Sequence, residues 1–469
     1  MLIILELPKK YDRIGKKRRK RIMKVSKIGL IGKKLTNTDP QYPVQDMLIQ
    51  TGQISQFASG IYAYGHIPYL VKKNIDDIIC EVLSKYGSSE ISLPILQPES
   101  LWQESGRLQK YVEEDVMFRC ITDKGNFCLA PTAEEAVVAY AKSRLSSYKQ
   151  LPVTFFQIGE KFRNEIRTRG FLLRGKAFDM MDAYSFGKDQ NDLDIEYEAM
   201  KKAYIEIFDR LGLEAQPVGA DNGSIGGSRS EEFMCMSSFG EDNILFDEKT
   251  GQAFNSELLD RPDCKEYLKD TYGIENIDNL VSKKAVELGH IFQLGDNYAK
   301  SMNATFVNEN GQSQNFCMGC YGIGVSRTLA MVYENSMIQD VNGKFAGISL
   351  PVNVTPYLLY IIPKLDDFEK NKQAVTIYEE LISKGVSVLF DDRPDISIGS
   401  KIKDSKIVGT PYVSVFGNTL EQGTIEVENN STGEKSVIEI EKFIELLMEL
   451  QSNKKNNVSL EDIIKSSIS

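Results

Sequence analysis

The sequence predicts an α+β domain built on an antiparallel sheet, followed by a smaller C-terminal α/β domain. Residues 153–186 form two apolar stretches joined by a polar, glycine-containing segment, which is typical of a long antiparallel hairpin. Residues 193–211 carry apolar side chains at helical spacing. From about residue 352, short strands alternate with helices, which indicates a small sheet with helices packed against it.

Composition agrees with this assignment. The 469 residues, 42% hydrophobic and 26% charged, suit a globular protein of about three domains. No apolar run approaches the ~20 residues that a membrane-spanning helix needs, so we expect a soluble protein. Seven cysteines, an odd number spread along the chain, favour a reducing compartment over a disulfide framework.

Two elements are expected before the hairpin. Residues 68–86 predict a helix, because Pro68 suits a first turn and the apolar residues that follow recur at helical spacing. Residues 91–95 predict a strand from the alternation of Ile91, Leu93 and Ile95. Since Pro94 has no N–H for a ladder, this strand should lie at an edge or an interface.

The C-terminal region gives a regular series of elements. A strand in TPYLLYII is followed by a helix that Gly385 ends, the strand VSVLFD, a short helix near 400–407, two strands and a last helix in IEIEKFIELLMEL. The polar stretch after residue 451 is expected to be frayed. The predicted boundaries are therefore 1–35, 36–351, 352–450 and 451–469.

Charge is unevenly distributed along the chain. Between Lys9 and Lys24 there are ten basic residues and one acidic residue, and the rest of the chain has 46 basic against 65 acidic residues, or −19. The basic segment has three interpretations: a solvated tail, which we favour, a nucleic-acid arm, or an organellar leader. Met23 is an alternative start. An acidic body of this size binds nucleic acid only through a local basic groove.

The first candidate site follows the first strand of the hairpin. Lys161, Arg163, Glu165 and Arg167 are spaced by two, so a strand would place all four on one face. A guanidinium beside a carboxylate can hold a phosphate and a hydrogen-bond donor of one ligand. A charged, solvent-facing sheet surface explains this stretch equally well.

The second candidate is MGCYGIGVSR, residues 318–327. Its glycines and Arg327 fit a tight passage from strand to helix, where the helix N-terminus favours phosphate, although the spacing is not that of a dinucleotide fingerprint. Cys317 and Cys320 have zinc-like spacing. Without a second pair or a nearby histidine, we expect no closed zinc site and interpret both as free thiols.

The third candidate is APTAEEAVV, residues 130–138. Pro131 and Thr132 can open a helix with Glu134 and Glu135 in its first turn, which is an ordinary capping arrangement. Alternatively, Glu134 faces a ligand ammonium. The segment GSIGGSRSEEF, residues 223–233, is either functional or only a flexible loop.

Taken together, the motifs and their order along the chain resemble those of the bacterial-type prolyl-tRNA synthetases, which are class II enzymes. The resemblance extends from about residue 45 to 445. SLPILQPESLWQESGR resembles motif 1 (about 76–98), KFRNEIRTRGFLLRGKAFDMMDAYSF resembles motif 2 (about 153–186), and MGCYGIGVSR resembles motif 3 (about 317–336). HIFQLGDNYAKSMNA and GSIGGSRSEEF also match in order. The resemblance implies a class II synthetase fold with a C-terminal anticodon-binding domain, and a homodimer.

The resemblance also implies the activity. ATP and L-proline would give prolyl adenylate and pyrophosphate, and the prolyl group would pass to the terminal adenosine of proline tRNA, with Mg²⁺ screening the polyphosphate. It implies these ATP-binding residues: Arg163, Glu165, Glu287, His290 and Arg327. It implies these proline-binding residues: Thr132, Glu134, Arg163, Tyr184, Phe292 and Cys320.

Individual roles follow from the same resemblance. Arg163 would bridge the α-phosphate and the substrate carboxylate, Glu165 would hold the adenine amino group, and Arg327 would grip the γ-phosphate. Arg163 and Arg327 are thus the expected catalytic residues. Arg393, Lys401 and Lys403, with Lys406 nearby, lie in or directly after the loop DRPDISIGS and are candidates for contacts with the anticodon. A solvated helix face is the alternative for these positions.

The chain departs from the family at several positions. Ala133 and Glu231 stand where histidine is usual, Met181 replaces a lysine, and the motif 2 loop reads TRGFLLR. These changes affect the pocket lining and the contacts with the acceptor end. The stretch between DAYSF and HIFQLG is also too short for the large editing insertion of many bacterial members. We therefore expect no editing of alanyl-tRNA in cis.

Two other functions fit parts of the pattern. One is a non-catalytic paralogue that binds tRNA or a protein partner, although Arg163, Glu165 and Arg327 argue for an ATP site. The other is a synthetase for another amino acid. We expect a cytoplasmic protein with no membrane partner, or an organellar protein if the basic N-terminus is a leader.

Overall fold

A computed structural model describes residues 23–29, 38–39, 42–168, 170–221, 225–238, 240–247, 252–274, 277 and 280–468. The basic segment lies almost entirely outside these residues. In the part of the chain so described, no helix is both long and apolar enough to cross a membrane.

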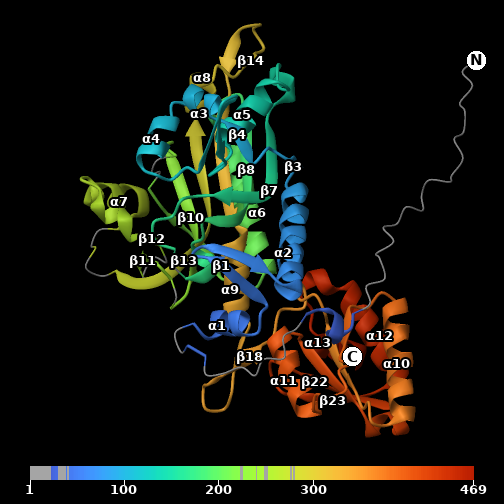
Figure 1. Cartoon of the computed structure of the whole chain (residues 1–469). Coiled ribbons are helices and arrows are strands. Elements are labelled where there is room, and N and C mark those ends of the chain that lie inside the picture. Colours follow the sequence, from blue (N-terminus) through green and yellow to red (C-terminus); the bar gives the residue numbers. More distant parts are fainter. Residues whose placement is uncertain are drawn as a thin grey trace, which may run out of the picture.

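A nine-stranded sheet, mostly antiparallel, forms the centre of the larger body (Figure 1). Its order is β10-β9-β12-β11-β13-β16-β8-β7-β3, and β10 also pairs with β13. The strands are β3 (Ser89–Glu90), β7 (Val153–Phe162), β8 (Ala177–Gly187), β9 (Ala215–Gly219), β10 (Arg229–Met236), β11 (Asp242–Phe246), β12 (Ala253–Asn255), β13 (Val281–Gly295) and β16 (Cys317–Gly324). The predicted antiparallel α+β architecture is confirmed.

The predicted hairpin is confirmed as β7 and β8, which pair antiparallel from Val153 opposite Phe186 to Phe162 opposite Ala177. The prediction that the strand continues to Arg167 is wrong. Arg163 N still donates to Lys176 O at 3.0 Å, but the chain then turns, as Glu165 N donates to Arg163 O at 2.8 Å. Lys161, Arg163, Glu165 and Arg167 therefore do not share one strand face.

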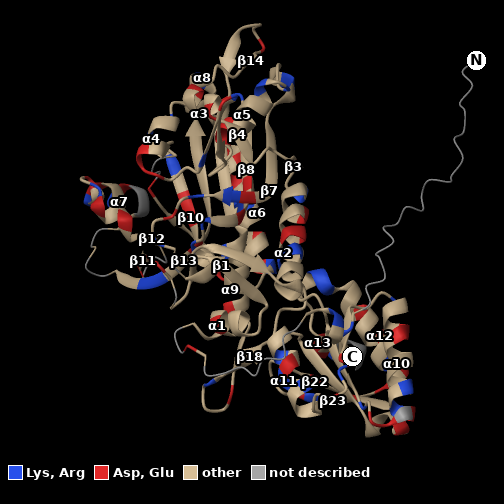
Figure 2. Cartoon of the chain, in the orientation of Figure 1, with Lys and Arg blue, Asp and Glu red and all other residues tan. Residues whose placement is uncertain are grey.

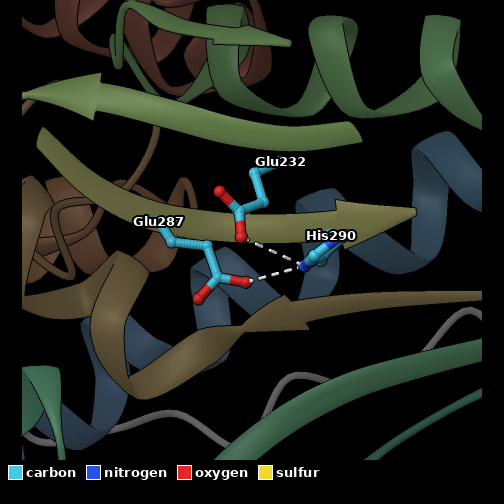
Figure 3. Close-up of side chains that lie close together, drawn as sticks. All are labelled: Glu232, Glu287 and His290. Atoms are coloured by element: carbon cyan, nitrogen blue, oxygen red, sulfur yellow. Dashed lines mark hydrogen bonds and ion pairs between the residues drawn. The ribbon is translucent and has the colours of Figure 1, made fainter. Parts of the chain in front are cut away.

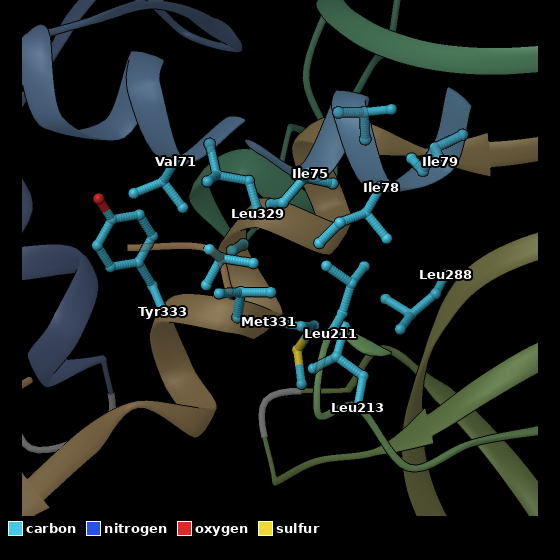
Figure 4. Packing of buried hydrophobic residues seen from close by; sticks show 14 of the residues in the cluster. Val71, Ile75, Ile78, Ile79, Leu211, Leu213, Leu288, Leu329, Met331 and Tyr333 are labelled. Carbon is cyan, nitrogen blue, oxygen red and sulfur yellow. The ribbon is translucent and has the colours of Figure 1, made fainter. Parts of the chain in front are cut away.

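Three helices cover one face of the sheet: α2 (His66–Lys85), α6 (Gln190–Arg210) and α9 (Val325–Asn335). They confirm the predicted helices at 68–86 and 193–211. Figure 4 shows Val71 and Ile75 of α2 pointing toward Leu329 of α9. All three side chains are 0% exposed, so the interior of this layer is fully removed from water.

The predicted strand at residues 91–95 is wrong. The chain there is extended but irregular between β3 and β4 (Leu96–Pro98). Ile91 N donates to Phe156 O, whereas Leu93 N donates to the side chain of Gln157, so the backbone leaves the ladder before Pro94.

Smaller elements close the two ends of the sheet. They include a three-stranded sheet of β4, β5 (Arg119–Thr122) and β6 (Gly125–Leu129), and two-stranded sheets of β1 (Ile54–Ala58) with β2 (Ile61–Tyr64), β14 (Thr305–Val307) with β15 (Ser313–Asn315), and β17 (Met337–Gln339) with β18 (Phe345–Ile348). The short helices are α1 (Pro43–Gln50), α3 (Glu99–Ser105), α4 (Leu108–Glu113), α5 (Glu134–Lys142), α7 (Cys264–Tyr272) and α8 (Asn297–Ser301).

The C-terminal region is a five-stranded sheet of order β20-β19-β21-β22-β23, with helices α10, α11, α12 and α13 around it (Figure 1). Its elements are β19 (Leu359–Pro363), α10 (Phe368–Ser383), β20 (Val388–Phe390), α11 (Ile398–Val408), β21 (Tyr412–Phe416), β22 (Thr424–Asn429), β23 (Lys435–Glu439), α12 (Ile440–Ser452) and α13 (Leu460–Ile468). This confirms the predicted α/β architecture. Both charge signs are mixed along α10 (Figure 2).

The prediction of a frayed tail after residue 451 is wrong for residues 460–463. Leu460 and Ile463 of α13 are 1% and 3% exposed and pack in the core of the C-terminal sheet. The backbone N–H of Leu460 donates to the Tyr412 hydroxyl at 2.8 Å. Two apolar residues one helical turn apart thus anchor a segment whose overall composition is polar.

The two bodies share buried apolar surface. Tyr357, Tyr360 and Leu389 belong to the same hydrophobic cluster as Val71 and Leu329 of the larger body. The chain also returns across the boundary near the N-terminus, where Phe390 N donates to Met23 O at 2.9 Å. The predicted boundary at residue 352 therefore falls within one continuous core.

Candidate functional site

One pocket gathers all ten residues that the sequence assigned to ATP and proline. Its floor is formed by β8, β13 and β16, and its walls by the N-terminus of α5, the segment after β7 and the first turn of α9. The predicted residues that line it are Thr132, Glu134, Arg163, Glu165, Tyr184, Glu287, His290, Phe292, Cys320 and Arg327. Residues far apart in the sequence thus form a single site.

One end of the pocket is built around the start of α5, whose first residue is Glu134. The Thr132 hydroxyl donates to Glu134 Oε2 at 2.6 Å, and the backbone N–H of Ala133 donates to the Tyr184 hydroxyl at 3.1 Å. Phe292 and Cys320 line the same end. A buried carboxylate next to aromatic and thiol surface suits a small ligand that carries an ammonium on an apolar ring.

A buried ion pair that the sequence analysis missed supports this end. Lys161 Nζ lies 2.7 Å from Asp182 Oδ1, and the Tyr184 hydroxyl donates to Asp182 Oδ2 at 3.0 Å. Burial raises the pKa of Asp182, and Lys161 opposes that shift. The signal was present in the sequence, because Asp182 interrupts the apolar face of Phe178 and Tyr184.

A second missed residue is Arg107, from the segment LWQESGR. Its Nη1 donates to Glu134 Oε2 at 3.2 Å and to Glu135 Oε1 at 3.1 Å. Neither carboxylate is appreciably exposed, with side chains 3% and 0% accessible. No periodicity links residue 107 to residue 134, so only the folded chain reveals this contact.

Three arginines line the rest of the pocket: Arg163 between its two ends, and Arg174 and Arg327 at the other end. Arg163 Nε donates to Pro131 O at 3.2 Å, and its guanidinium lies over the Phe178 ring at 5.3 Å from the centroid. Arg174 Nε donates to Glu165 Oε2 at 2.9 Å. Arginines held by fixed partners along an open wall are suited to a polyphosphate.

Arg327 confirms the predicted passage from strand to helix. The strand β16 ends at Gly324, and α9 starts at Val325, so Arg327 stands in the first turn. Its Nη1 lies 2.7 Å from Glu287 Oε2 and its Nε donates to Leu173 O at 3.0 Å. Although burial raises the pKa of Glu287, Arg327 and His290 together hold it below its usual range.

Three groups in this region lie close enough to hold a cation. Figure 3 shows the carboxylates of Glu232 and Glu287 pointing toward the His290 ring. His290 Nδ1 lies 3.5 Å from Glu232 Oε1 and 3.2 Å from Glu287 Oε1. Burial and the neighbouring charge of Glu287 raise the pKa of Glu232 to about 8. Excess negative charge at this point favours a bound cation.

The two cysteines of motif MGCYGIGVSR have different surroundings. Cys320 is buried and lines the pocket, and burial raises the pKa of its thiol. Cys317 lies three residues earlier on β16, so its side chain points to the opposite face of the strand. Opposite faces do not allow the two thiols to bind one ion.

The departures lie around this pocket. Ala133 and Met181 are buried in apolar surroundings. Glu231 lies on the opposite face of β10 from Glu232, where Lys201 Nζ is 2.7 Å from its Oε1 and the Tyr197 hydroxyl donates to it at 2.9 Å. Glu231 is therefore compensated by its own partners and does not add to the charge of the cation site.

The predicted basic patch of the C-terminal body is smaller than expected. Lys401 is 2% exposed and its Nζ donates to Asp391 O at 3.1 Å, so this lysine is not a surface contact. Arg393 is bound by Asp391 and Asp404, each at 2.6 Å. Lys403 is exposed on α11, whereas Lys406 is only partly exposed. Charge spacing along the sequence did not reveal that Asp391 neutralises two of the four positions.

Two regions of the chain match known protein families. Residues 118–336 match the family described as tRNA synthetase class II core domain (G, H, P, S and T), and residues 358–450 match the anticodon binding domain. A proline–tRNA ligase of Ehrlichia ruminantium is 38% identical over 438 residues, which cover 90% of this chain and 99% of that protein. One from Ehrlichia canis is 36% identical over 426 residues, covering 88% and 96%.

Longer relatives and solved structures are also similar. A proline–tRNA ligase of Caldicellulosiruptor bescii is 30% identical over 572 aligned positions, which cover 91% of this chain and 98% of that protein. The crystal structure of prolyl-tRNA synthetase from Cryptosporidium parvum complexed with halofuginone and AMPPNP has a TM-score of 0.68 at 16% identity, covering 91% of this chain and 78% of that one. The likeness to that structure shows the fold.

Proposed function

The chain belongs to the proline–tRNA ligase family, and from this premise we propose that it activates L-proline with ATP and transfers the prolyl group to proline tRNA. The single observation that carries the proposal is the convergence of ten separately encoded residues on one pocket with an ammonium-binding end and a phosphate-binding end. Both substrates of adenylate formation then lie side by side.

Adenylate formation needs the proline carboxylate to attack the α-phosphorus of ATP while pyrophosphate leaves. Thr132 and Glu134 bind the proline ammonium, with Tyr184, Phe292 and Cys320 around the ring. Arg163 contacts both the carboxylate and the α-phosphate, and neutralises charge that builds up there in the transition state. Its contact with Pro131 O is the support for this role, since it fixes the guanidinium beside the start of α5.

The rest of ATP lies along the arginine-lined end. Glu165 accepts from the adenine amino group, and Arg327 binds the γ-phosphate. Because no covalent enzyme intermediate forms, the rate enhancement comes from positioning and from charge stabilisation. Arg174 pairs with Glu165, and Arg327 pairs with Glu287. When ATP binds, its adenine amino group therefore replaces Arg174 at Glu165, and its γ-phosphate replaces Glu287 at Arg327.

The acidic cluster fits Mg²⁺. Hard oxygen ligands suit this ion, and the Glu232 and Glu287 carboxylates supply them within 4.8 Å of each other and of His290. Burial and the Glu287 carboxylate disfavour ionised Glu232, as its raised pKa shows, and a bound cation would favour that ionised form. These residues would hold the ion, which would screen the charge of the polyphosphate.

Transfer follows when a ribose hydroxyl of the terminal adenosine attacks the prolyl carbonyl carbon and AMP leaves. A second hollow shares Arg163, Glu165 and Arg174 with the pocket and adds Tyr111 and Ile166. Ile166 is 86% exposed at the edge of this hollow. We assign the hollow to the acceptor end of the tRNA, because it joins the pocket at Arg163, the residue assigned to the reacting carboxylate and the α-phosphate.

Three further features complete the proposal. The C-terminal body binds the anticodon, with Lys403 and the partly exposed Arg393 as candidate contacts. A homodimer is supported by apolar side chains left exposed around the motif 1 segment, among them Tyr69, Ile95 and Leu96 at 49%, 40% and 49%. The seven free cysteines suit the reducing cytoplasm.

Pyrophosphate exchange against all twenty amino acids tests the proposal. We expect ATP to incorporate labelled pyrophosphate with proline and, more slowly, with alanine. Exchange with a different amino acid alone would indicate another synthetase. No exchange with any amino acid, from a folded protein that still binds tRNA, would favour a non-catalytic paralogue.

A further inference from the structure

Arg107 is a buried cation to which the proposed reaction gives no role. It follows Gly106, whose φ of +79° ends α3 and turns the chain inward. Its side chain is 11% accessible, and its guanidinium lies beside the rings of Trp102, Tyr111 and Tyr298 at 5.2, 4.7 and 5.4 Å from the centroids. The rings fix the plane of the guanidinium.

The guanidinium edge faces two carboxylates. Nη1 contacts both Glu134 Oε2 and Glu135 Oε1, while Nη2 donates to the Tyr111 hydroxyl. The Ser105 hydroxyl also donates to Glu135 Oε1, at 2.8 Å. Thr132 and Arg107 both donate to the same oxygen of Glu134, so the rotamer of this carboxylate is held from two sides.

Glu134, Glu135 and Arg107 together carry one net negative charge at this end of the pocket. Glu134 and Glu135 contribute two negative charges and Arg107 one positive charge, whereas the amino-acid substrate brings one ammonium. We propose that Arg107 is a positioning residue that leaves one net negative charge for the ammonium and directs it to Glu134. This inference rests on the proposed function, since it concerns the same substrate.

The chemistry of adjacent buried carboxylates explains why the cation is needed. Two such groups without a cation cannot both stay ionised, so one takes up a proton. Burial already raises the pKa of Glu135, with Arg107 opposing the shift. The titratable groups that face Glu134 are Arg107, Tyr111, Glu135, Tyr184, Tyr298 and Cys320. Arg163 lies farther along the same pocket, at Pro131 O, and among the described residues Arg107 is the cation that contacts Glu134 directly.

A pair of opposite charge changes tests the inference. In Arg107→Met, we expect the KM for proline in pyrophosphate exchange to rise about tenfold or more, and to rise further as pH falls, while the KM for ATP stays within about threefold. Glu135→Gln leaves Glu134 fully neutralised by Arg107, so the KM for proline should again rise. The double variant Arg107→Met/Glu135→Gln restores one net negative charge and should bind proline better than either single variant.

A purely structural role predicts the opposite order, because the double variant loses more polar contacts than either single variant. A double variant no better than Arg107→Met, or Arg107→Met with the parent's KM and pH profile, overturns the inference. Arg119→Met is the control, since Arg119 of β5 pairs with Glu99 of α3 and its loss should not affect the KM for proline. If Arg107→Met fails to fold, Glu135→Gln alone decides: an unchanged KM refutes the inference.

Should the parent itself show no exchange with proline, the proposed function fails before the variants are compared. The two failures are therefore distinguishable.

Discussion

The two ends of the pocket treat buried charge differently. At the amino-acid end, each buried carboxylate has a cation in contact: Arg107 for Glu134 and Glu135, and Lys161 for Asp182. At the ATP end, the strongest charge neighbour of Glu232 is another carboxylate, Glu287.

The difference shows at which end every buried carboxylate is paired with a cation of the chain. A compensated, fully packed end is preorganised and suits a small substrate whose shape must be read closely. At the other end, burial and the Glu287 carboxylate disfavour ionised Glu232, so a bound cation would favour its ionisation, and Arg174 and Arg327 are paired with Glu165 and Glu287. We therefore expect substitutions at the first end to change recognition of proline and those at the second to change the dependence on ATP and metal.

The largest effect is expected at Arg163, which stands between the two ends. Arg163→Ala should lower the rate of pyrophosphate exchange by a hundredfold or more, because losing a preorganised donor to a developing charge costs about 3 kcal/mol. The exposed Arg144, over the ring of Tyr140, provides the control Arg144→Ala. Exchange by Arg163→Ala within twofold of the parent, with unchanged thermal unfolding, would remove this residue from the reaction.

Many of the elements and residues that form the two ends of the pocket could be predicted from the sequence. The alternation in residues 177–186 and the glycines before Arg327 predicted β8 and the passage from β16 to α9, and the motifs identified ten residues that do converge. Local pattern is sufficient where a residue's role depends on its own strand or helix.

The pairing of each buried charge with its partner could not be predicted from the sequence. The contact of Arg107 with Glu134 joins segments 27 residues apart without a period, and Lys161 with Asp182 joins two strands whose register only the ladder defines. The same reason explains the error at Lys401, which looked like a surface cation until the fold placed it against Asp391. Sequence shows where charges are, and tertiary structure shows which remain uncompensated.

The ATP end is tested through Glu232. A carboxyl whose pKa is raised on folding contributes stability that is present below its unfolded pKa, near 4.5, and is lost as pH rises through about 8. Glu232→Gln cannot ionise and should therefore be more stable than the parent at pH 9, by about 1 to 3 kcal/mol, with little difference at pH 4.

The same variant should use Mg²⁺ less well, with the concentration for half-maximal exchange raised about tenfold. Thermal unfolding from pH 4 to 9 and a Mg²⁺ titration measure the two effects. Glu231→Gln is the control, because Glu231 faces the other side of β10 and pairs with Lys201. Equal pH profiles for both variants would show that Glu232 carries no surplus charge.

The C-terminal body should give a smaller effect. Lys403→Glu should lower kcat/KM for tRNA charging about three- to tenfold, more at low salt, and leave pyrophosphate exchange unchanged. Lys442→Glu on α12 makes the same charge change elsewhere on this body. Deleting residues 352–469 is not an equivalent test, because Tyr357, Tyr360 and Leu389 belong to the shared core and their loss would expose it. An equal effect of both lysine variants would mean that only the overall charge matters.

The smallest expected effect is an absence of hydrolysis, and it extends the comparison to discrimination between substrates. Alanine fits any pocket that accepts proline, and each missing methylene changes selectivity by only about 1 to 3 kcal/mol, so the compensated end alone leaves some alanine activation. The relative from Caldicellulosiruptor bescii aligns over 572 positions, more than the 469 residues of this chain, and so carries residues without a counterpart here.

In this chain, the described part of the corresponding stretch is taken up by β9 to β12 and α7. Phe254, Leu258, Leu268 and Ile274 form its small apolar cluster. Between the end of β12 at Asn255 and the start of β13 at Val281 there are fewer than ~40 residues, a length that rarely forms an independent core, so we expect no second hydrolytic site in this segment. Alanyl-tRNA specific for proline, given to the purified enzyme, should deacylate at the spontaneous rate, and a known trans-acting deacylase added to the same tRNA is the positive control. Hydrolysis well above the spontaneous rate that persists in Arg163→Ala would locate an editing site outside the pocket, whereas hydrolysis lost in that variant would place it within.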